Sequence, residues 1–215
     1  MTTRLVVFDL DGTLIDSRQD LADAANALIV ERGGSPLPVD AVTGMVGEGA
    51  ALLVRRALTA AGLDADVEKA LPRFLELYDE RLLANTRPYP GTTEVLDALA
   101  PRATLAVLTN KPQRPTEAIL RGLNLHLYFA QVIGGDTAFG RKPDPAGLRH
   151  IIALAHVPAE ETVLVGDSAI DLRTARAAGV PICLVTYGFG FPLAVPELSG
   201  EERLVGSPGE LARLP

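Results

Sequence analysis

Short runs of apolar residues recur along the chain and constrain its fold more than any other feature. Segments with helical periodicity separate most of these runs. Strands that are apolar at every position, and not only at alternate ones, are typical of a parallel sheet covered by helices on both faces. The sequence therefore predicts an α/β fold with a doubly wound, Rossmann-like parallel sheet. The predicted strands are residues 5–8, 105–108, 132–133, 163–165 and 182–185.

The interval after the first strand contains no convincing strand pattern and shows only helical periodicity. Ser17 followed by Asp20 is typical of a helix start, and the two glycines at residues 33–34 are typical of a stop. A second helix is predicted over residues 49–61. A third is predicted from about residue 66, and it contains a proline at position 72 that bends it or marks its start.

These helices form an insertion in the α/β core. We expect a helical cap at residues 16–87, inserted after the first strand, and a core made of residues 1–15 and 88–215. Towards the C-terminus, residues 203–205 are predicted to form an edge strand, followed by a short helix near Glu210.

Composition excludes several classes of protein. The net charge of −7 and the pI near 5.0 argue against a nucleic-acid binder, because such proteins gather lysine and arginine on one face. The apolar stretch near the N-terminus is too short for a signal peptide or a membrane span. The single cysteine, Cys183, lies in an apolar run and is expected to be a buried strand thiol. We expect a cytoplasmic protein, a monomer or weak homodimer, that acts on a small molecule.

Polar and charged residues follow several of the predicted strands directly. Because the carboxyl ends of parallel strands meet at one edge of a sheet, these residues are expected to lie close together. Like charges repel and lose hydration on burial, so four carboxylates at one edge call for a cation. The residues concerned are Asp9, Asp11, Thr109, Asn110, Lys142, Asp167 and Asp171.

Magnesium fits this set of ligands, since Mg²⁺ prefers carboxylate, water and phosphate oxygens. Phosphate monoesters hydrolyse extremely slowly in water, and an aspartate can divide the reaction into two steps by accepting the phosphoryl group. A second carboxylate can protonate the leaving alcohol and later activate water. Asp9 and Asp11 have a spacing that suits these two roles, and Lys142 can offset the remaining negative charge.

Four motifs together resemble those of the haloacid dehalogenase-like hydrolases. They are Asp-Leu-Asp-Gly-Thr at 9–13, Thr-Asn at 109–110, Lys-Pro at 142–143 and Gly-Asp-Ser-Ala-Ile-Asp at 166–171. The resemblance covers the whole chain, including a helical cap after the first strand. It implies a Mg²⁺-dependent phosphohydrolase that works through an aspartyl-phosphate.

The resemblance also implies roles for the first motif. Asp9 would be the nucleophile and a metal ligand. Asp11 would be the general acid and base, and would bind the metal through its backbone carbonyl. Dehalogenating members of the family lack the second aspartate, so Asp11 favours phosphoryl transfer.

The other motifs receive their roles in the same way. Thr109 and the backbone amide of Asn110 would hold the phosphoryl group. Lys142 would neutralise its charge and orient the nucleophile. Asp167 would bind the metal, and Asp171 would bind the metal or its water shell. Taken alone, Asp171 could instead cap a helix over residues 172–178.

The stretch at residues 46–58 bears on the substrate. It is similar to the cap segment of phosphoglycolate phosphatases, which implies 2-phosphoglycolate as the substrate. We expect Gly47, Glu48 and Gly49 to close over the substrate at a helix N-terminus, with Arg55 or Arg56 pairing with its carboxylate. The competing interpretation is a solvated helix with surface arginines, and Glu48 favours it unless its carboxylate points outward or hydrogen-bonds the substrate.

Two other functions remain open from the sequence. A sugar-phosphate mutase of the same family would return the phosphoryl group to a sugar. A phosphoacceptor signalling module also combines an acidic Mg²⁺ site with threonine and lysine on a parallel sheet, but it carries its phosphoacceptor on a later strand and lacks the large helical insertion.

Overall fold

The computed structural model describes residues 3–214. Its strands are β1 (Leu5–Phe8), β2 (Ile15–Asp16), β3 (Arg87–Pro88), β4 (Thr104–Leu108), β5 (Gln131–Ile133), β6 (Thr162–Gly166), β7 (Ile182–Val185) and β8 (Arg203–Val205). Its α-helices are α1 (Arg18–Glu31), α2 (Val39–Thr43), α3 (Ala50–Ala60), α4 (Val67–Asp79), α5 (Thr92–Leu99), α6 (Gln113–Gly122), α7 (Ala146–Ala155), α8 (Ala169–Ala178) and α9 (Phe191–Ala194). Short 3₁₀ helices are η1 (His126–Tyr128), η2 (Ala159–Glu161), η3 (Val195–Glu197) and η4 (Pro208–Arg213).

Six of the strands form one parallel sheet in the order β5-β4-β1-β6-β7-β8. Strand β1 lies inside the sheet. Strands β4 and β5 follow on one side of it, and the later strands β6, β7 and β8 follow on the other side. Strand order therefore reverses beside β1, and ligands of open α/β sheets bind at such a point. The predicted doubly wound α/β fold is confirmed.

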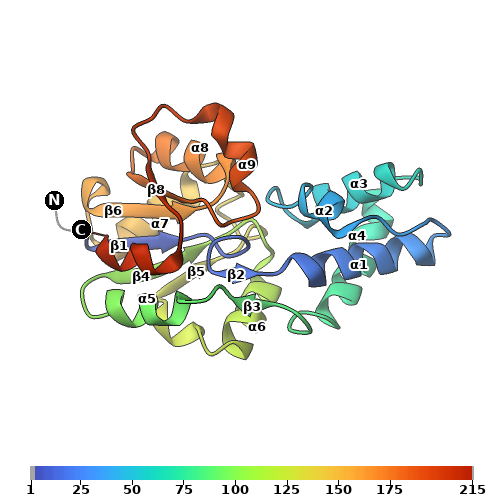
Figure 1. Ribbon diagram of the computed structural model, residues 1–215, viewed down its shortest axis with the longest axis horizontal. Coiled ribbons are helices and arrows are strands. Elements are labelled where there is room, and N and C mark those ends of the chain that lie inside the picture. The colour runs from blue at the N-terminus through green and yellow to red at the C-terminus, as the bar shows by residue number, and fades with distance from the viewer. Residues whose placement is uncertain (1–2, 215) are drawn as a thin grey trace.

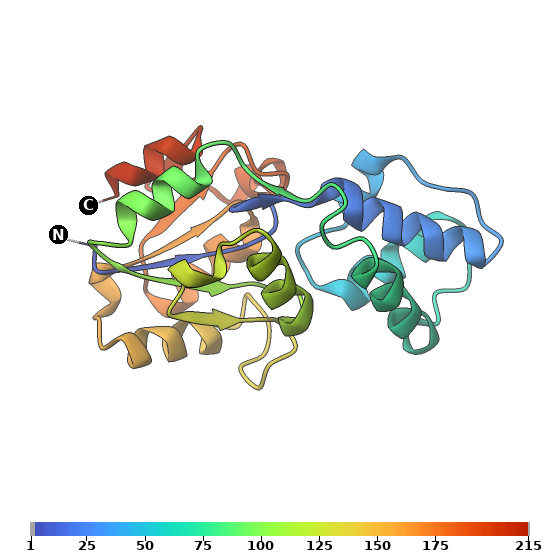
Figure 2. The same cartoon turned by 90° about the horizontal axis from the view of Figure 1, so that it is seen from below.

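Successive residues of β1 face opposite sides of the sheet. Val6 and Phe8 belong to a core shared with α5, α6 and η4, whereas Leu5 and Val7 belong to a core shared with α7 and α8. Figure 2 shows α5 and the red C-terminal segment above the sheet and α7, in gold, below it. Both faces are thus covered, which explains why the strands are apolar at every position.

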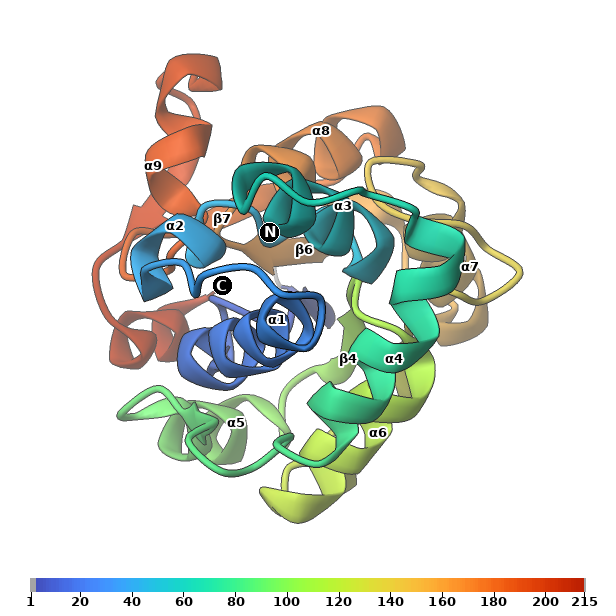
Figure 3. The same ribbon diagram turned by 90° about the vertical axis from the view of Figure 1, so that its right-hand side faces the viewer.

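Helices α1 to α4 lie apart from the sheet and pack on one another around a separate hydrophobic core (Figure 1). Viewed from that end of the molecule, they stand in front of the strand ends (Figure 3). The two chain segments that connect them to the sheet pair as an antiparallel ribbon, with Ile15 opposite Pro88 and Asp16 opposite Arg87.

Four local features differ from the sequence-based expectations. Helix α4 begins at Val67 and continues through Pro72, so of the two expected roles this proline does not mark the start of the helix. The expected helix near Glu210 is the 3₁₀ helix η4. Helix α2 and the strand pair β2–β3 were not expected, because elements of two to five residues carry little periodicity.

The start of α1 also differs in its detail. The helix begins at Arg18, as expected, but Ser17 makes no capping hydrogen bond with its side chain. Both polar side chains of the expected start have other partners: the hydroxyl of Ser17 donates to Asp11, and Asp20 binds the segment that precedes β3. Tertiary contacts have replaced the local cap.

Cys183 is buried and makes no disulfide. None of the helices within residues 3–214 combines the length and the apolar character needed to cross a bilayer.

Candidate active site

The carboxyl ends of three adjacent strands bring polar residues together. Asp9 follows β1, Thr109 follows β4 and Asp167 follows β6 directly. Because β1 pairs with both β4 and β6, these residues stand side by side at the edge where the strand order reverses. All three side chains are buried.

The ammonium group of Lys142 lies between two carboxylates of this edge, those of Asp9 and Asp171. Its Nζ is 2.9 Å from Oδ1 of Asp9 and 2.6 Å from Oδ1 of Asp171. Burial alone lowers the pKa of a lysine, but Asp171 and Asp9 raise the pKa of Lys142 above its ordinary value. The ammonium is therefore charged and fixes the orientation of Asp9.

Three carboxylates form a cluster suited to a metal ion. Oxygens of Asp9, Asp167 and Asp171 all lie within 4.8 Å of one another. Burial raises the pKa of Asp9 to about 6, against the opposing attraction of Lys142. Burial, together with the charges of Asp171 and Asp9, raises the pKa of Asp167 well above its ordinary value. A divalent cation among these oxygens would relieve both effects.

The hydrogen bonds distinguish the three members of this cluster. Both oxygens of Asp171 are engaged, Oδ1 by Lys142 and Oδ2 by the backbone N–H and hydroxyl of Ser168. Within residues 3–214, Oδ2 of Asp9 and Oδ1 of Asp167 accept no hydrogen bond. The free carboxylate oxygens of Asp9 and Asp167 are therefore suited to bind Mg²⁺ directly. Asp171 instead positions Lys142 and Ser168 next to the site.

The predicted helix cap at Asp171 needs one correction. Helix α8 begins at Ala169, and Ser168 is its N-cap, while Asp171 closes a capping box as the third helical residue. Asp171 thus caps the helix and also contacts Lys142. Nothing larger than glycine fits at the strand end behind it, since a Cβ on Gly166 would lie 2.3 Å from Cγ of Asp171.

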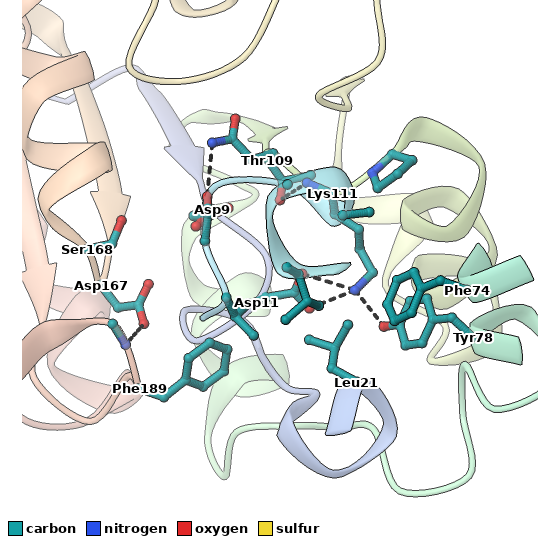
Figure 4. Close-up of a pocket in the computed structure, with 18 of the residues that line it drawn as sticks. Asp9, Asp11, Leu21, Phe74, Tyr78, Thr109, Lys111, Asp167, Ser168 and Phe189 are labelled. Carbon is teal, nitrogen blue, oxygen red and sulfur yellow. Dashed lines mark hydrogen bonds and ion pairs between the residues drawn. The ribbon is translucent and has the colours of Figure 1, made fainter. Parts of the chain in front are cut away.

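Asp11 is held by two side chains, and a third contacts one of these two. The hydroxyl of Ser17 donates to Oδ1 of Asp11 at 2.5 Å, and Nζ of Lys111 lies 3.0 Å from both carboxylate oxygens. Lys111 in turn donates to the hydroxyl of Tyr78, in α4, at 2.6 Å. Figure 4 shows the lysine extending from beside Thr109 to both partners.

Ser17, Lys111 and Tyr78 were not expected as site residues. Lys111 directly follows the Thr-Asn pair after a predicted strand, and this position indicates that it lies near the edge of the sheet. Nothing in the sequence shows which side chains it contacts. Tyr78 carried only the periodicity of a core residue. Burial alone lowers the pKa of a lysine, yet Asp11 and Tyr78 raise the pKa of Lys111 above its ordinary value.

A narrow cavity opens between this edge of the sheet and helices α1, α3 and α4. The space inside it that a water molecule can reach measures about 60 Å³. Gly47 and Gly49 line it, as expected for the loop before α3, and the side-chain amide of Asn110 donates to the carbonyl of Gly47 at 2.9 Å. Its other lining residues include Asp9, Asp11, Asp167, Ser168, Thr109, Asn110, Lys111, Leu21, Val46, Leu53, Phe74, Tyr78 and Phe189.

Three expected substrate ligands do not line this cavity in the part of the chain that the structure describes: Glu48, Arg55 and Arg56. Arg56 forms an ion pair with Glu48, and the side chain of Arg55 is exposed. The pairing of Arg55 or Arg56 with the substrate carboxylate stays a prediction, as does the closure of Glu48 over the substrate.

Comparison with known proteins identifies the family of the chain. The family model of haloacid dehalogenase-like hydrolases matches residues 6–185. A phosphoglycolate phosphatase of Rhodospirillum rubrum is 47% identical over 194 residues, which cover 86% of this chain and 80% of that protein. A plasmid-borne phosphoglycolate phosphatase of Cupriavidus necator is 40% identical over 205 residues, or 94% of this chain and 88% of that protein.

Solved structures agree with these relatives. A structure from Haemophilus somnus, described as a predicted phosphoglycolate phosphatase, superposes with a TM-score of 0.91 at 29% identity and covers 98% of this chain and 97% of its own. A structure described as a putative β-phosphoglucomutase, from Thermotoga maritima, gives a TM-score of 0.76 at 27% identity, with 98% and 97% covered. The chain belongs to the haloacid dehalogenase-like hydrolases.

Proposed function

We propose that this protein is a Mg²⁺-dependent phosphatase that hydrolyses a small phosphate monoester, 2-phosphoglycolate, through an aspartyl-phosphate on Asp9. The observation that carries the proposal is the position of Asp9 in the cavity. One oxygen of its carboxylate is held by Lys142, and the other accepts no hydrogen bond within residues 3–214. A buried carboxylate with one oxygen fixed and one available is suited to nucleophilic attack.

Mg²⁺ would be held by the carboxylates of Asp9 and Asp167 and by the backbone carbonyl of Asp11, with Asp171 in its water shell. When bound, it would neutralise charge on the phosphoryl oxygens. We also propose that residues 16–87 act as the cap over this site and that residues 1–15 and 88–215 form the core.

The chain's own residues carry the two chemical steps. In the first, the free oxygen of Asp9 forms a bond to phosphorus while the phosphorus–ester oxygen bond breaks, and Asp11 gives its proton to the departing alcohol. In the second, Asp11 takes a proton from water, the water oxygen bonds to phosphorus, and the bond to Asp9 breaks to release inorganic phosphate. Thr109 and the backbone amide of Asn110 hold the phosphoryl group, and Lys142 offsets its charge.

Two observations support a small substrate. The cavity is narrow, since the centre of a water molecule can occupy only about 60 Å³ inside it, and this favours a compact ester. The relatives that align over most of this chain carry the name phosphoglycolate phosphatase.

The test is release of inorganic phosphate with Mg²⁺ from 2-phosphoglycolate, sugar phosphates, nucleotides and pyrophosphate. We expect the highest kcat/KM with 2-phosphoglycolate. Asp9→Asn should lower turnover at least about a thousandfold, because the nucleophile carries the covalent route. Asp144→Asn, an exposed aspartate two residues from Lys142, is the matched control. Retained turnover in Asp9→Asn would contradict the mechanism, and preference for a larger ester would contradict the substrate.

A sugar-phosphate mutase is the second candidate, supported by the likeness to the structure from Thermotoga maritima. Product analysis separates the two. Inorganic phosphate is the product of a phosphatase, and an isomeric sugar phosphate is the product of a mutase.

A further inference from the structure

Lys111 and Tyr78 meet where the sheet faces helices α1 to α4, and the two chemical steps above use neither. Lys111 follows β4, with Thr109 and Asn110 between them, whereas Tyr78 lies in α4. Nζ of Lys111 donates to the hydroxyl of Tyr78 at 2.6 Å and lies 4.6 Å from the centroid of its ring. The lysine is 6% exposed and the tyrosine 2% exposed. Burial of a cation is costly unless it faces negative charge, and Asp11, with both carboxylate oxygens 3.0 Å from Nζ, supplies that charge.

The cavity offers a substrate only one cationic side chain among residues 3–214, and it is that of Lys111. The other lysine of the site, Lys142, is held by Asp9 and Asp171 and does not line the cavity. The wall opposite the carboxylates is apolar, with Leu53 and Phe74 among its members. Among the residues that line the cavity in the described part of the chain, Lys111 is therefore the one that can pair with an anionic group beyond the phosphoryl group.

We propose that Lys111, together with the hydroxyl of Tyr78, recognises a carboxylate carried by the substrate one methylene group from its ester oxygen. This inference rests on the proposed phosphatase function. In that function Asp11 protonates the ester oxygen, and Nζ of Lys111 lies 3.0 Å from both oxygens of Asp11. Lys111 thus lies one contact beyond the proposed general acid, on the side from which it can reach a carboxylate joined to the ester oxygen by one methylene group.

The arrangement also assigns a role to the cap. The cation comes from the core, and the hydroxyl beside it comes from α4, so both lie at the carboxylate only while α4 faces the sheet as it does here. The arginines of α3 are placed differently, because Arg56 pairs with Glu48 and neither Arg55 nor Arg56 lines the cavity in the described part of the chain. Selectivity for an acidic substrate then resides in Lys111 and Tyr78.

The test compares two esters that differ only at the recognised group: 2-phosphoglycolate and 2-hydroxyethyl phosphate. We measure kcat/KM for each, with saturating Mg²⁺, in the unaltered protein, Lys111→Met and Tyr78→Phe. Lys111→Met should lower kcat on both esters, because Lys111 also contacts Asp11. The ratio of the two kcat/KM values should fall further, by about ten- to a hundredfold, as expected when a charge-assisted hydrogen bond to the substrate is lost. Tyr78→Phe should lower the ratio severalfold, mainly through KM.

Two control variants make the same chemical changes outside the site. Lys69→Met removes a positive charge from an exposed position of the same helix as Tyr78. Tyr128→Phe removes a hydroxyl that donates to Asp97, and neither of these residues lines the cavity. Both should leave the ratio unchanged. Circular dichroism of every variant checks folding, and where Lys111→Met does not fold, Lys111→Arg and Tyr78→Phe decide the question by the same ratio.

Three outcomes would overturn the proposal. Equal losses on both esters in the variants of Lys111 and Tyr78 would leave these residues as positioning groups for Asp11 only. A fall of the ratio in Arg55→Gln or Arg56→Gln, with none in Lys111→Met, would assign the carboxylate to α3. If the unaltered protein releases no phosphate from either ester, the proposed function fails, and the inference fails with it. In the other two outcomes the unaltered protein does release phosphate, and Asp9→Asn abolishes that release.

Discussion

Asp20 and Thr86 tie together the two segments that connect helices α1 to α4 to the sheet. Oδ2 of Asp20 accepts hydrogen bonds from both the backbone N–H and the hydroxyl of Thr86, each at 2.7 Å. Asn85 adds its backbone N–H and its side-chain amide at 2.9 Å. Both Asp20 and Thr86 are fully buried. One carboxylate near the start of α1 therefore fixes the chain just before β3.

Removal of this carboxylate should destabilise the protein strongly. Asp20→Ala leaves the buried N–H and hydroxyl groups of Thr86, and the N–H groups of Asn85, without their acceptor, so we expect a loss of about 2–4 kcal/mol in the free energy of unfolding. Urea denaturation followed by circular dichroism measures it. Asp23→Ala, one turn further along α1, removes only a contact with Gln19 and should change the free energy by less than about 0.5 kcal/mol. A similarly small change in Asp20→Ala would contradict the structural role.

The same carboxylate should make stability depend on pH. Burial opposes its charge, but the hydrogen bonds from Thr86 and Asn85 hold the pKa of Asp20 below its ordinary value of 3.8. A lowered pKa in the folded state means that the stabilisation is present above pH 3.8 and is lost as the pH falls through the folded-state pKa. The difference in unfolding free energy between the unaltered protein and Asp20→Asn should therefore be constant near neutral pH and shrink below about pH 4. A difference that does not change down to pH 2 would contradict the lowered pKa.

Ser17 should affect turnover more than binding. Its hydroxyl donates to Oδ1 of Asp11 at 2.5 Å, and the side chain is buried. Ser17→Ala removes one of the groups that orient the proposed general acid and base, so we expect kcat for 2-phosphoglycolate to fall about tenfold with little change in KM. Steady-state kinetics measures both constants. Ser207→Ala, on the surface near the C-terminus, should change neither. A rise in KM with kcat unchanged would assign Ser17 to substrate binding instead.

Gly12 should control the metal site through Asp167. A Cβ at position 12 would lie 2.1 Å from Oδ2 of Asp167, and Gly12 has a φ of +85°. Gly12→Ala must displace that carboxylate, so we expect the Mg²⁺ concentration for half-maximal activity to rise at least about tenfold. Gly33→Ala is a matched control, since Gly33 has a φ of +82° and nothing within 4 Å of the added atom. It should share the backbone strain of about 1 kcal/mol and leave the Mg²⁺ dependence unchanged. Equal Mg²⁺ dependence in both variants would contradict the proposed role of Asp167.

The sequence by itself determined the sheet and the set of groups at its edge. Uniformly apolar strands alternating with helices predict a parallel sheet, and a parallel sheet has its carboxyl ends on one side. The residue that directly follows each strand is then placed by chain connectivity alone. Asp9, Thr109 and Asp167 could be assigned to one edge for this reason, before any side-chain contact was known.

The tertiary structure decided how helices α1 to α4 meet that edge. Arg55 and Arg56 looked suited to a substrate carboxylate because they follow a glycine-rich loop, yet neither lines the cavity within residues 3–214. Lys111 and Tyr78 are 33 positions apart and touch only because α4 faces the segment that follows β4. Such contacts depend on how the core of the sheet and the core of helices α1 to α4 are placed relative to each other. They also depend on the positions of the terminal atoms of long side chains. No local pattern in a single sequence determines either of these.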